Sequence, residues 1–153
     1  MQQRLNYTKA SPAAYQAMLA LQATVEKSGL EKLLLELIKI RASQINQCAF
    51  CLHMHTRDAR KAGEREERIY LLDAWRESSF YTERERAALA WTEAMTLLPD
   101  QGAPDDVYAD MTAHFSEPEI VNVTLAIVAI NAWNRIGVGF NLRHPSLPKT
   151  LEA

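Results

Sequence analysis

The residues best suited to chemistry lie in one short stretch, where the only two cysteines, Cys48 and Cys51, precede two of the four histidines, His53 and His55. Two thiols with this CxxC spacing can form a disulfide, hold a metal ion or pack inertly. If Cys48 begins a helix that turns about 100° per residue, Cys51 lies one turn later on nearly the same face. His55 then lies about 40° from Cys51, and His53 about 200° from it. The helical phase therefore selects His55 to serve the thiols.

A thiol pair at the start of a helix is suited to redox chemistry. The first turn exposes N–H groups and the positive end of the helix dipole, which favour a thiolate, and His55 can accept the proton of Cys51. A thiolate that attacks a peroxide becomes a sulfenic acid, which a neighbouring thiol converts to a disulfide. An external dithiol must then reduce that disulfide. Glu36, twelve residues before Cys48, is a candidate to orient His55 or to stabilise its charge.

Metal binding and inert packing stay open on residue types alone. Zinc could take Cys48, Cys51 and either nearby histidine, but it needs a fourth ligand or an open position. The sequence has no second CxxC and no HxxxH, and only His114 and His144 remain.

The elements that position this stretch are predicted to be helices. Apolar residues recur at helical spacing, Ser-Pro and Thr-x-x-Glu patterns mark helix starts, and no alternating strand pattern or Asn-Gly hairpin signal occurs. The residues from 99 to 104 are predicted to form a loop. The predicted helices span residues 12–28, 30–46, 48–62, 66–77, 82–98, 104–115 and 116–135 or beyond. We therefore expect an all-α fold of about seven helices in a single domain, residues 1–153.

Two of these helices carry polar residues that we expect to be buried. Glu36 lies beside the apolar stripe of its helix, so partial burial is expected. The last helix is apolar on most faces, which predicts a central position in the domain or at a subunit contact. Asn131 and Asn134 interrupt it, and buried amides need partners. They could line a pocket or join helices across a subunit contact, and we favour the structural role.

Composition narrows the class of protein. Apolar residues make up 48% of the chain and charged residues 24%, which is globular composition. The net charge of −2 gives no reason to expect nucleic acid or an anionic membrane as partner. The N-terminus has no apolar core, and the longest apolar run, Leu125–Ile130, is too short to span a membrane. We expect a cytoplasmic protein, in which a CxxC is more often catalytic, redox-active or metal-binding than a static bridge.

The arrangement of Glu36, Cys48, Cys51 and His55 resembles the core motif of the alkylhydroperoxidase AhpD-like family, within the carboxymuconolactone decarboxylase-like superfamily. The glutamate-to-cysteine spacing, the CxxC and the histidine four residues later all match, most densely over residues 33–63. Residues 130–135, Ile-Asn-Ala-Trp-Asn-Arg, are also similar to the late helix of single-core members.

The resemblance implies a thiol-dependent peroxidase that reduces hydrogen peroxide or alkyl hydroperoxides. It implies Cys51 as the peroxidatic thiol, Cys48 as the resolving thiol, and His55 with Glu36 as the proton relay. It also implies an external dithiol reductant, a homo-oligomer of three or six chains, and no bound metal, haem or other cofactor.

One position departs from the family pattern. The best-studied members have a histidine immediately before the second cysteine, where this chain has Phe50. The departure predicts a simpler relay or a more apolar peroxide pocket. Two other functions stay as alternatives: a decarboxylase acting on a lactone, which needs no dithiol, and a non-catalytic redox sensor or zinc-binding module.

Overall fold

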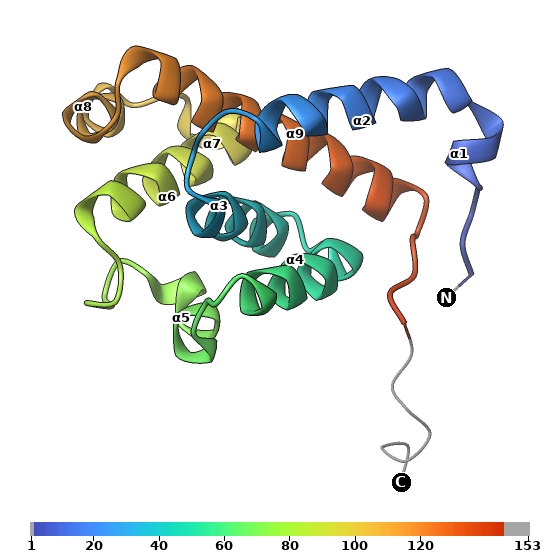
Figure 1. Cartoon of the computed structure of the whole chain (residues 1–153), viewed down its shortest axis with the longest axis horizontal. Helices are drawn as coiled ribbons and strands as arrows, with labels where there is room; N and C mark the ends of the chain where they lie inside the picture. The colour runs from blue at the N-terminus through green and yellow to red at the C-terminus, as the bar shows by residue number, and fades with distance from the viewer. Residues whose placement is uncertain (1, 146–153) are drawn as a thin grey trace, which may run out of the picture.

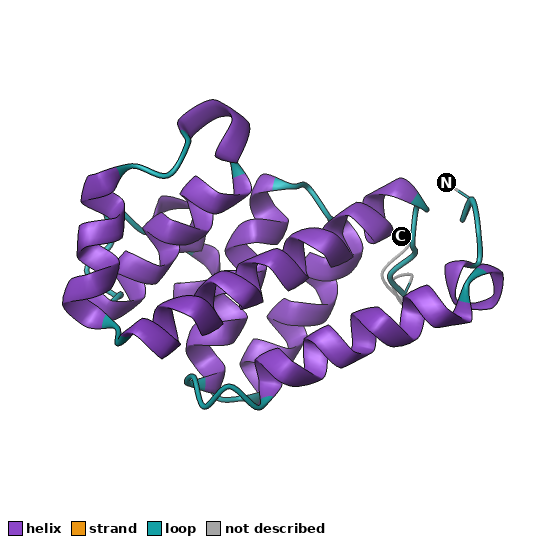
Figure 2. Cartoon of the chain, turned by 90° about the horizontal axis from the view of Figure 1, so that it is seen from above, coloured by secondary structure: helices purple, strands orange, loops and turns teal. Residues whose placement is uncertain are grey.

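The computed structural model describes residues 2–145, apart from the side chain of Gln101, and these residues form helices joined by short loops with no strand among them (Figures 1 and 2). The predicted all-α class is confirmed. The helices are α1 (Tyr7–Ala10), α2 (Pro12–Glu26), α3 (Lys32–Ile45), α4 (Ala49–Lys61), α5 (Glu66–Tyr70), a 3-10 turn (Leu72–Ala74), α6 (Glu83–Thr96), α7 (Leu98–Gln101), α8 (Asp105–His114) and α9 (Glu117–Gly139).

The predicted helices are all present, but two predicted segments differ from the structure. The helix predicted over residues 66–77 is too long, because α5 ends at Tyr70 and the chain bends into a 3-10 turn that buries Leu72 and Trp75. The loop predicted over residues 99–104 is wrong at its start, where α7 forms one turn. Proline is tolerated in a first turn, and Gly102, with φ of 67°, ends that turn.

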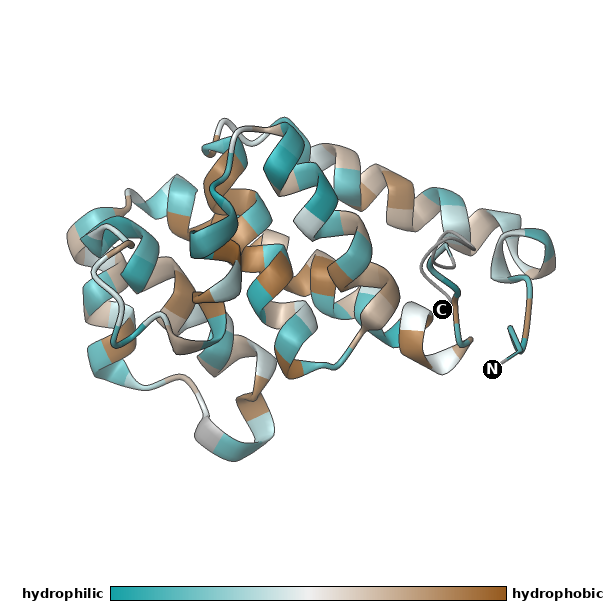
Figure 3. Cartoon of the chain, turned by 90° about the horizontal axis from the view of Figure 1, so that it is seen from below, coloured by the Kyte–Doolittle hydropathy of each residue, from teal (hydrophilic) through white to brown (hydrophobic). Residues whose placement is uncertain are grey.

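The central element is α3, which Figure 1 shows nearly end-on between α4, α6 and α9. Leu34, Leu35 and Ile38 pack into one cluster with apolar residues of α6, α8 and α9. Leu37 and Ile40 pack on the other side, with residues of α4, α6 and the 3-10 turn. Coloured by hydropathy, the apolar residues gather where the helices face one another (Figure 3). α3 is therefore held from both sides, and its polar residues take well-defined positions.

The longest helix, α9, has the central position predicted from its apolar sequence. By length and composition it is the one helix of residues 2–145 that could cross a membrane, with a mean hydropathy of 1.3 over its most apolar window. It packs against α2, α3 and α6, and it buries Val123, Ile127 and Ile130. Its apolar character is accounted for in part by this packing inside the domain.

The N-terminal segment is held against the far end of α9. Arg4 donates from its backbone N–H to the carbonyl oxygen of Phe140 (3.0 Å) and from its side chain to that of Gly139 (3.0 Å). The ring of Tyr7 stacks on Phe140, with centroids 6.1 Å apart. α2 then runs back alongside α9, as Figure 2 shows, with only Val25 of its residues buried. This return path brings Tyr7 of α1 and Tyr15 of α2 to the lining of a cavity that they share with Phe50 and Met54 of α4.

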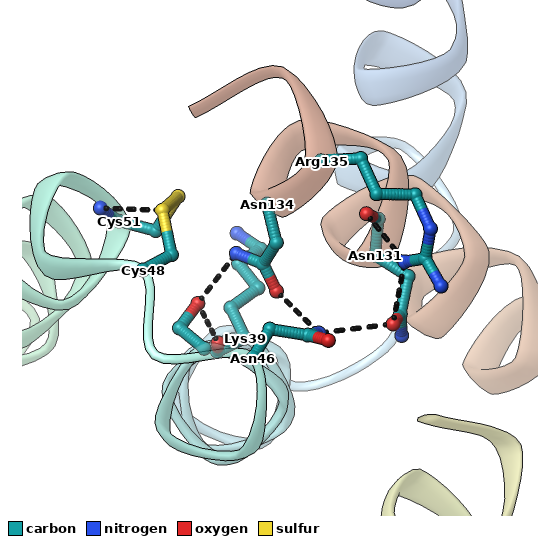
Figure 4. Close-up of a disulfide and its surroundings, with 8 residues drawn as sticks. Lys39, Asn46, Cys48, Cys51, Asn131, Asn134 and Arg135 are labelled. Carbon is teal, nitrogen blue, oxygen red and sulfur yellow. Dashed lines mark hydrogen bonds between the residues drawn. A yellow bond between two sulfur atoms is a disulfide. The ribbon is translucent and has the colours of Figure 1, made fainter. Parts of the chain in front are cut away.

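A buried amide network ties the C-terminal end of α3 to α9 (Figure 4). Asn46 donates to the side-chain oxygens of Asn131 (3.0 Å) and Asn134 (2.9 Å). Asn134 donates to the hydroxyl of Ser43 (3.0 Å), and Asn131 donates to the hydroxyl of Thr96 in α6 (3.0 Å). Asn131 and Asn134 thus join α9 to α3 and α6 within one chain, which satisfies their buried amides without the subunit contact that the sequence suggested.

We expect Asn134→Ala to lower the free energy of unfolding by about 2 kcal/mol, because it leaves the half-buried amide of Asn46 with one acceptor fewer and the buried Ser43 hydroxyl without its donor. Asn122→Ala is the matched control on the same helix, since Asn122 is half-buried and makes one 3.4 Å bond to the carbonyl oxygen of Ser28. Urea unfolding measures both. Equal losses for the two variants would contradict a specific role of the network.

Candidate active site

The turn between α3 and α4 sets the position of the first cysteine. α3 ends in a Schellman motif: Gln47 takes the left-handed region (φ 54°), its N–H donates to the carbonyl oxygen of Gln44 (3.1 Å), and the N–H of Cys48 donates to that of Ser43 (3.0 Å). Cys48 is at once the last residue of this motif and the N-cap of α4, so the end of α3 dictates where its sulfur lies.

Cys48 and Cys51 form a disulfide across the first turn of α4, with their Cα atoms 5.3 Å apart (Figure 4). The N–H of Cys51 points at the Sγ of Cys48 at 3.4 Å, so that sulfur occupies the position of an N-cap acceptor. The two residues are 1% and 2% exposed. A negative charge on Cys48 would be stabilised here by the free N–H groups of the helix start.

The disulfide packs directly against the backbone of α9 at Gly137. A β-carbon added to Gly137 would lie 2.8 Å from the Sγ of Cys48 and 3.5 Å from that of Cys51. Real β-carbons do not approach another atom as closely as the first of these distances. The absence of a side chain at Gly137 is therefore a condition for the two sulfurs to occupy this place.

Glu36 and His55 come together from α3 and α4. The Oε2 atom of Glu36 lies 3.0 Å from Nδ1 of His55, and both side chains are buried. An ionised carboxylate can only accept, so His55 donates through Nδ1 and keeps Nε2 free to take a proton. Burial acts to raise the pKa of Glu36, but the hydrogen bond from His55 and the charge of Lys39 outweigh it, and the pKa is lowered.

Lys39 was not singled out by sequence reasoning, although its position one turn after Glu36 on the same helix was a usable signal. Its Nζ donates to Oε1 of Glu36 at 2.9 Å, so the two oxygens of that carboxylate serve two different partners. Sequence reasoning also missed Gly137, for which nothing in the sequence gave a signal.

A cavity of about 350 Å³ opens beside the disulfide, and of the two cysteines only Cys51 lines it. Glu36, Lys39 and His55 line it as well. Most of its remaining wall is apolar or aromatic, contributed by α1, α2, α4, α9 and the segment after α9, and comprises Tyr7, Tyr15, Leu19, Phe50, Met54, Trp133 and Leu142. Gln22, Glu26 and Asp58 supply further polar groups. A small organic molecule in this cavity would meet Cys51 and His55 together.

The predicted site residues divide into those that share this cavity and those that do not. Glu36, Cys51 and His55 line it, and Cys48 lies behind Cys51, bonded to it and facing Gly137. His53 is exposed on another face of α4, where its ring stacks on His144 at 5.5 Å between centroids. Within residues 2–145, no three His, Cys, Asp or Glu side chains gather in a way that could hold a metal ion.

The sequence profile of the carboxymuconolactone decarboxylase family matches residues 12–94. The matched stretch runs from the first residue of α2 into α6, and it contains Glu36, both cysteines and His55.

Three similar proteins extend the comparison to more than nine-tenths of the chain. The uncharacterized protein YdfG of Bacillus subtilis (strain 168) is 43% identical over 146 residues, which are 95% of this chain and 99% of the relative. A crystal structure from Agrobacterium tumefaciens, of a protein of unknown function described as a candidate antioxidant defence protein AhpD, is 52% identical with a TM-score of 0.93, covering 95% of this chain and 100% of that one. The debrominase Bmp8 is 18% identical with a TM-score of 0.82, covering 91% of this chain and 75% of its own, and this likeness shows the fold alone.

We expect Gly137→Ala to destabilise the disulfide form by about 1–3 kcal/mol, because the new methyl group would overlap the sulfur of Cys48 in a packed interior. Gly139→Ala is the matched control, since a β-carbon there meets nothing within 4 Å and alanine is the better helix former. Urea unfolding of the oxidised proteins gives both values. A Gly137→Ala protein as stable as Gly139→Ala would show that the disulfide does not need this close approach.

Proposed function

The chain is an AhpD-like member of the carboxymuconolactone decarboxylase family, and on this premise we propose that it is a thiol-dependent peroxidase. One observation carries the proposal: Cys51 lines a cavity together with the bonded pair of Glu36 and His55, and its sulfur is linked to that of Cys48. A nucleophilic sulfur, a base held in place by a carboxylate and a second sulfur within bonding distance are the parts that peroxide reduction by a dithiol requires.

In the reduced protein, Nε2 of His55 takes the proton of the Cys51 thiol while Glu36 stays ionised and holds Nδ1. The thiolate attacks the terminal hydroxyl oxygen of the peroxide and the O–O bond breaks. The leaving alkoxide, or hydroxide from hydrogen peroxide, takes the proton back from His55 and departs as an alcohol or water. Cys51 is now a sulfenic acid. The thiol of Cys48 attacks its sulfur, water leaves, and the disulfide forms. An external dithiol returns both cysteines to thiols and is itself oxidised to a disulfide.

The walls of the cavity favour an organic hydroperoxide over hydrogen peroxide. The rings of Tyr15 and Trp133 lie edge to face, with centroids 6.4 Å apart, and Phe50 and Met54 complete an apolar surface next to Cys51. Burial of an alkyl or aryl group against this surface contributes binding that hydrogen peroxide cannot obtain. Phe50, where the family pattern has histidine, adds to this apolar wall.

The alternatives account for less of the site. Decarboxylation of a lactone needs no dithiol, so it leaves the Cys48–Cys51 pair without a purpose. A redox sensor would form the same disulfide but would not turn over. Continuous consumption of peroxide with a dithiol present therefore separates an enzyme from a sensor.

The experiment is peroxide consumption by the purified protein with a dithiol reductant. We expect Cys51→Ser to abolish turnover, because it removes the nucleophile, and Cys48→Ser to stop after one equivalent of peroxide if no thiol is added. His55→Ala is expected to lower kcat/KM by about 10²–10⁴-fold through loss of the base. His53→Ala is the matched control on the same helix and should keep the wild-type rate. Full activity in Cys51→Ser would refute the proposal.

Assembly of identical chains belongs to the same proposal. α9 exposes Val121 (65%) and Val128 (52%), two turns apart on one side of the helix, beside the half-buried Leu125. Apolar residues aligned in this way are suited to contact with another subunit. Light scattering on the eluting protein is expected to give a mass of three or six chains, and Val128→Glu should lower that mass. A monomer at micromolar concentration would contradict this.

A further inference from the structure

Lys39 is a buried lysine that the steps above leave without a role. It is 7% exposed, and its Nζ donates to Oε1 of Glu36 at 2.9 Å. An ammonium group taken out of water is costly unless it is paired with an opposite charge. Peroxide reduction as written uses only Oε2 of Glu36, the oxygen that faces His55. A carboxylate could hold His55 without a lysine on its other oxygen.

The charges around the cavity indicate what Lys39 adds. It is the one lysine or arginine among the described residues that line the cavity. Two further carboxylates reach the same wall, Glu26 from α2 and Asp58 from α4, the latter 3.1 Å from the guanidinium of Arg57. The other titratable groups of the lining are Tyr7 and Tyr15, and Lys32 shares a neighbouring cavity with Glu36 and Lys39. Without Lys39, the only positive charge available to a thiolate of Cys51 from this lining would be a protonated His55.

An uncompensated carboxylate would work against a thiolate of Cys51. The full negative charge of Glu36, together with Glu26 and Asp58, would oppose a second negative charge in the same cavity. A positive charge on the second oxygen of Glu36 reduces this repulsion while it leaves the hydrogen bond to His55 intact. Interactions between charges are strong here because the groups are buried.

We propose that Lys39 is a positioning residue of the Cys51 site, whose ammonium group offsets the charge of Glu36 so that His55 stays oriented and Cys51 can lose its proton. The inference rests on the proposed peroxidase function for its catalytic meaning. It assigns to Lys39 an effect on the pH at which the thiol becomes reactive, beyond its contribution to folding.

The test is the pH dependence of kcat/KM for an alkyl hydroperoxide in Lys39→Met. Without this positive charge the Cys51–His55 pair loses its proton less readily. The rise of kcat/KM on the acidic side of the profile (the acid limb) should therefore move to higher pH by about one unit. Lys39→Arg keeps the charge and should return the limb towards its wild-type position. Lys32→Met, which removes an exposed lysine from the same helix, should leave the profile unchanged. A Lys39→Met profile of wild-type shape and position, only lower, would show a structural role alone and overturn the inference.

A second measurement separates this inference from the proposed function. In reduced protein with Cys48→Ser, the rate at which iodoacetamide alkylates Cys51 reports the thiolate without any peroxide. Lys39→Met should shift the pH dependence of that rate upwards, and the same shift should be absent when Glu36→Gln is also present. If alkylation shifts but no peroxide is consumed, the role of Lys39 stands and the peroxidase proposal fails. If peroxide is consumed and neither profile shifts, the peroxidase proposal stands and the proposed role of Lys39 fails.

Discussion

The buried carboxylate of Glu36 is the constraint on which the site depends. Its two oxygens bind Lys39 at 2.9 Å and His55 at 3.0 Å, so one side chain joins α3 to α4 at the floor of the cavity. An isolated charge would be excluded from this position, and removal of one partner of such a buried pair typically costs about 3–5 kcal/mol. The same contacts that make the burial of Glu36 tolerable also leave Nε2 of His55 free, so stability and chemistry rest on one set of atoms.

The position of α3 makes this arrangement possible. Apolar clusters on two sides hold the helix, and its last residues build the turn that delivers Cys48 to the start of α4. The amide network of Asn46, Asn131 and Asn134 then fastens that end of α3 to α9. Because α9 presents Gly137 at the sulfurs, the disulfide lies between two helices that are already tied together. The turn that carries the disulfide is thereby held on both sides, and the cavity next to it has mostly apolar and aromatic walls.

The two sulfurs differ in what surrounds them. Cys48 faces α9 and accepts from the backbone N–H of Cys51, whereas Cys51 faces the cavity with His55. A sulfur at a helix N-cap is a good place for negative charge, and a sulfur at a cavity wall is a good place for attack. This asymmetry supports the proposal that Cys51 is the attacking thiol and Cys48 the resolving thiol.

The sequence by itself determined the helical class and most helix positions, because apolar periodicity and capping residues are local signals. It also determined that His55 rather than His53 shares a face with Cys51, since that follows from helical phase alone. Tertiary structure decided the rest. The packing of helices that are distant in sequence brings Glu36 to His55 and Lys39 to the second oxygen of Glu36. It also sets Gly137 against the sulfurs and aromatic residues of α1, α2 and α9 around Cys51. Helical phase places a side chain on a face, but only packing decides what that face meets.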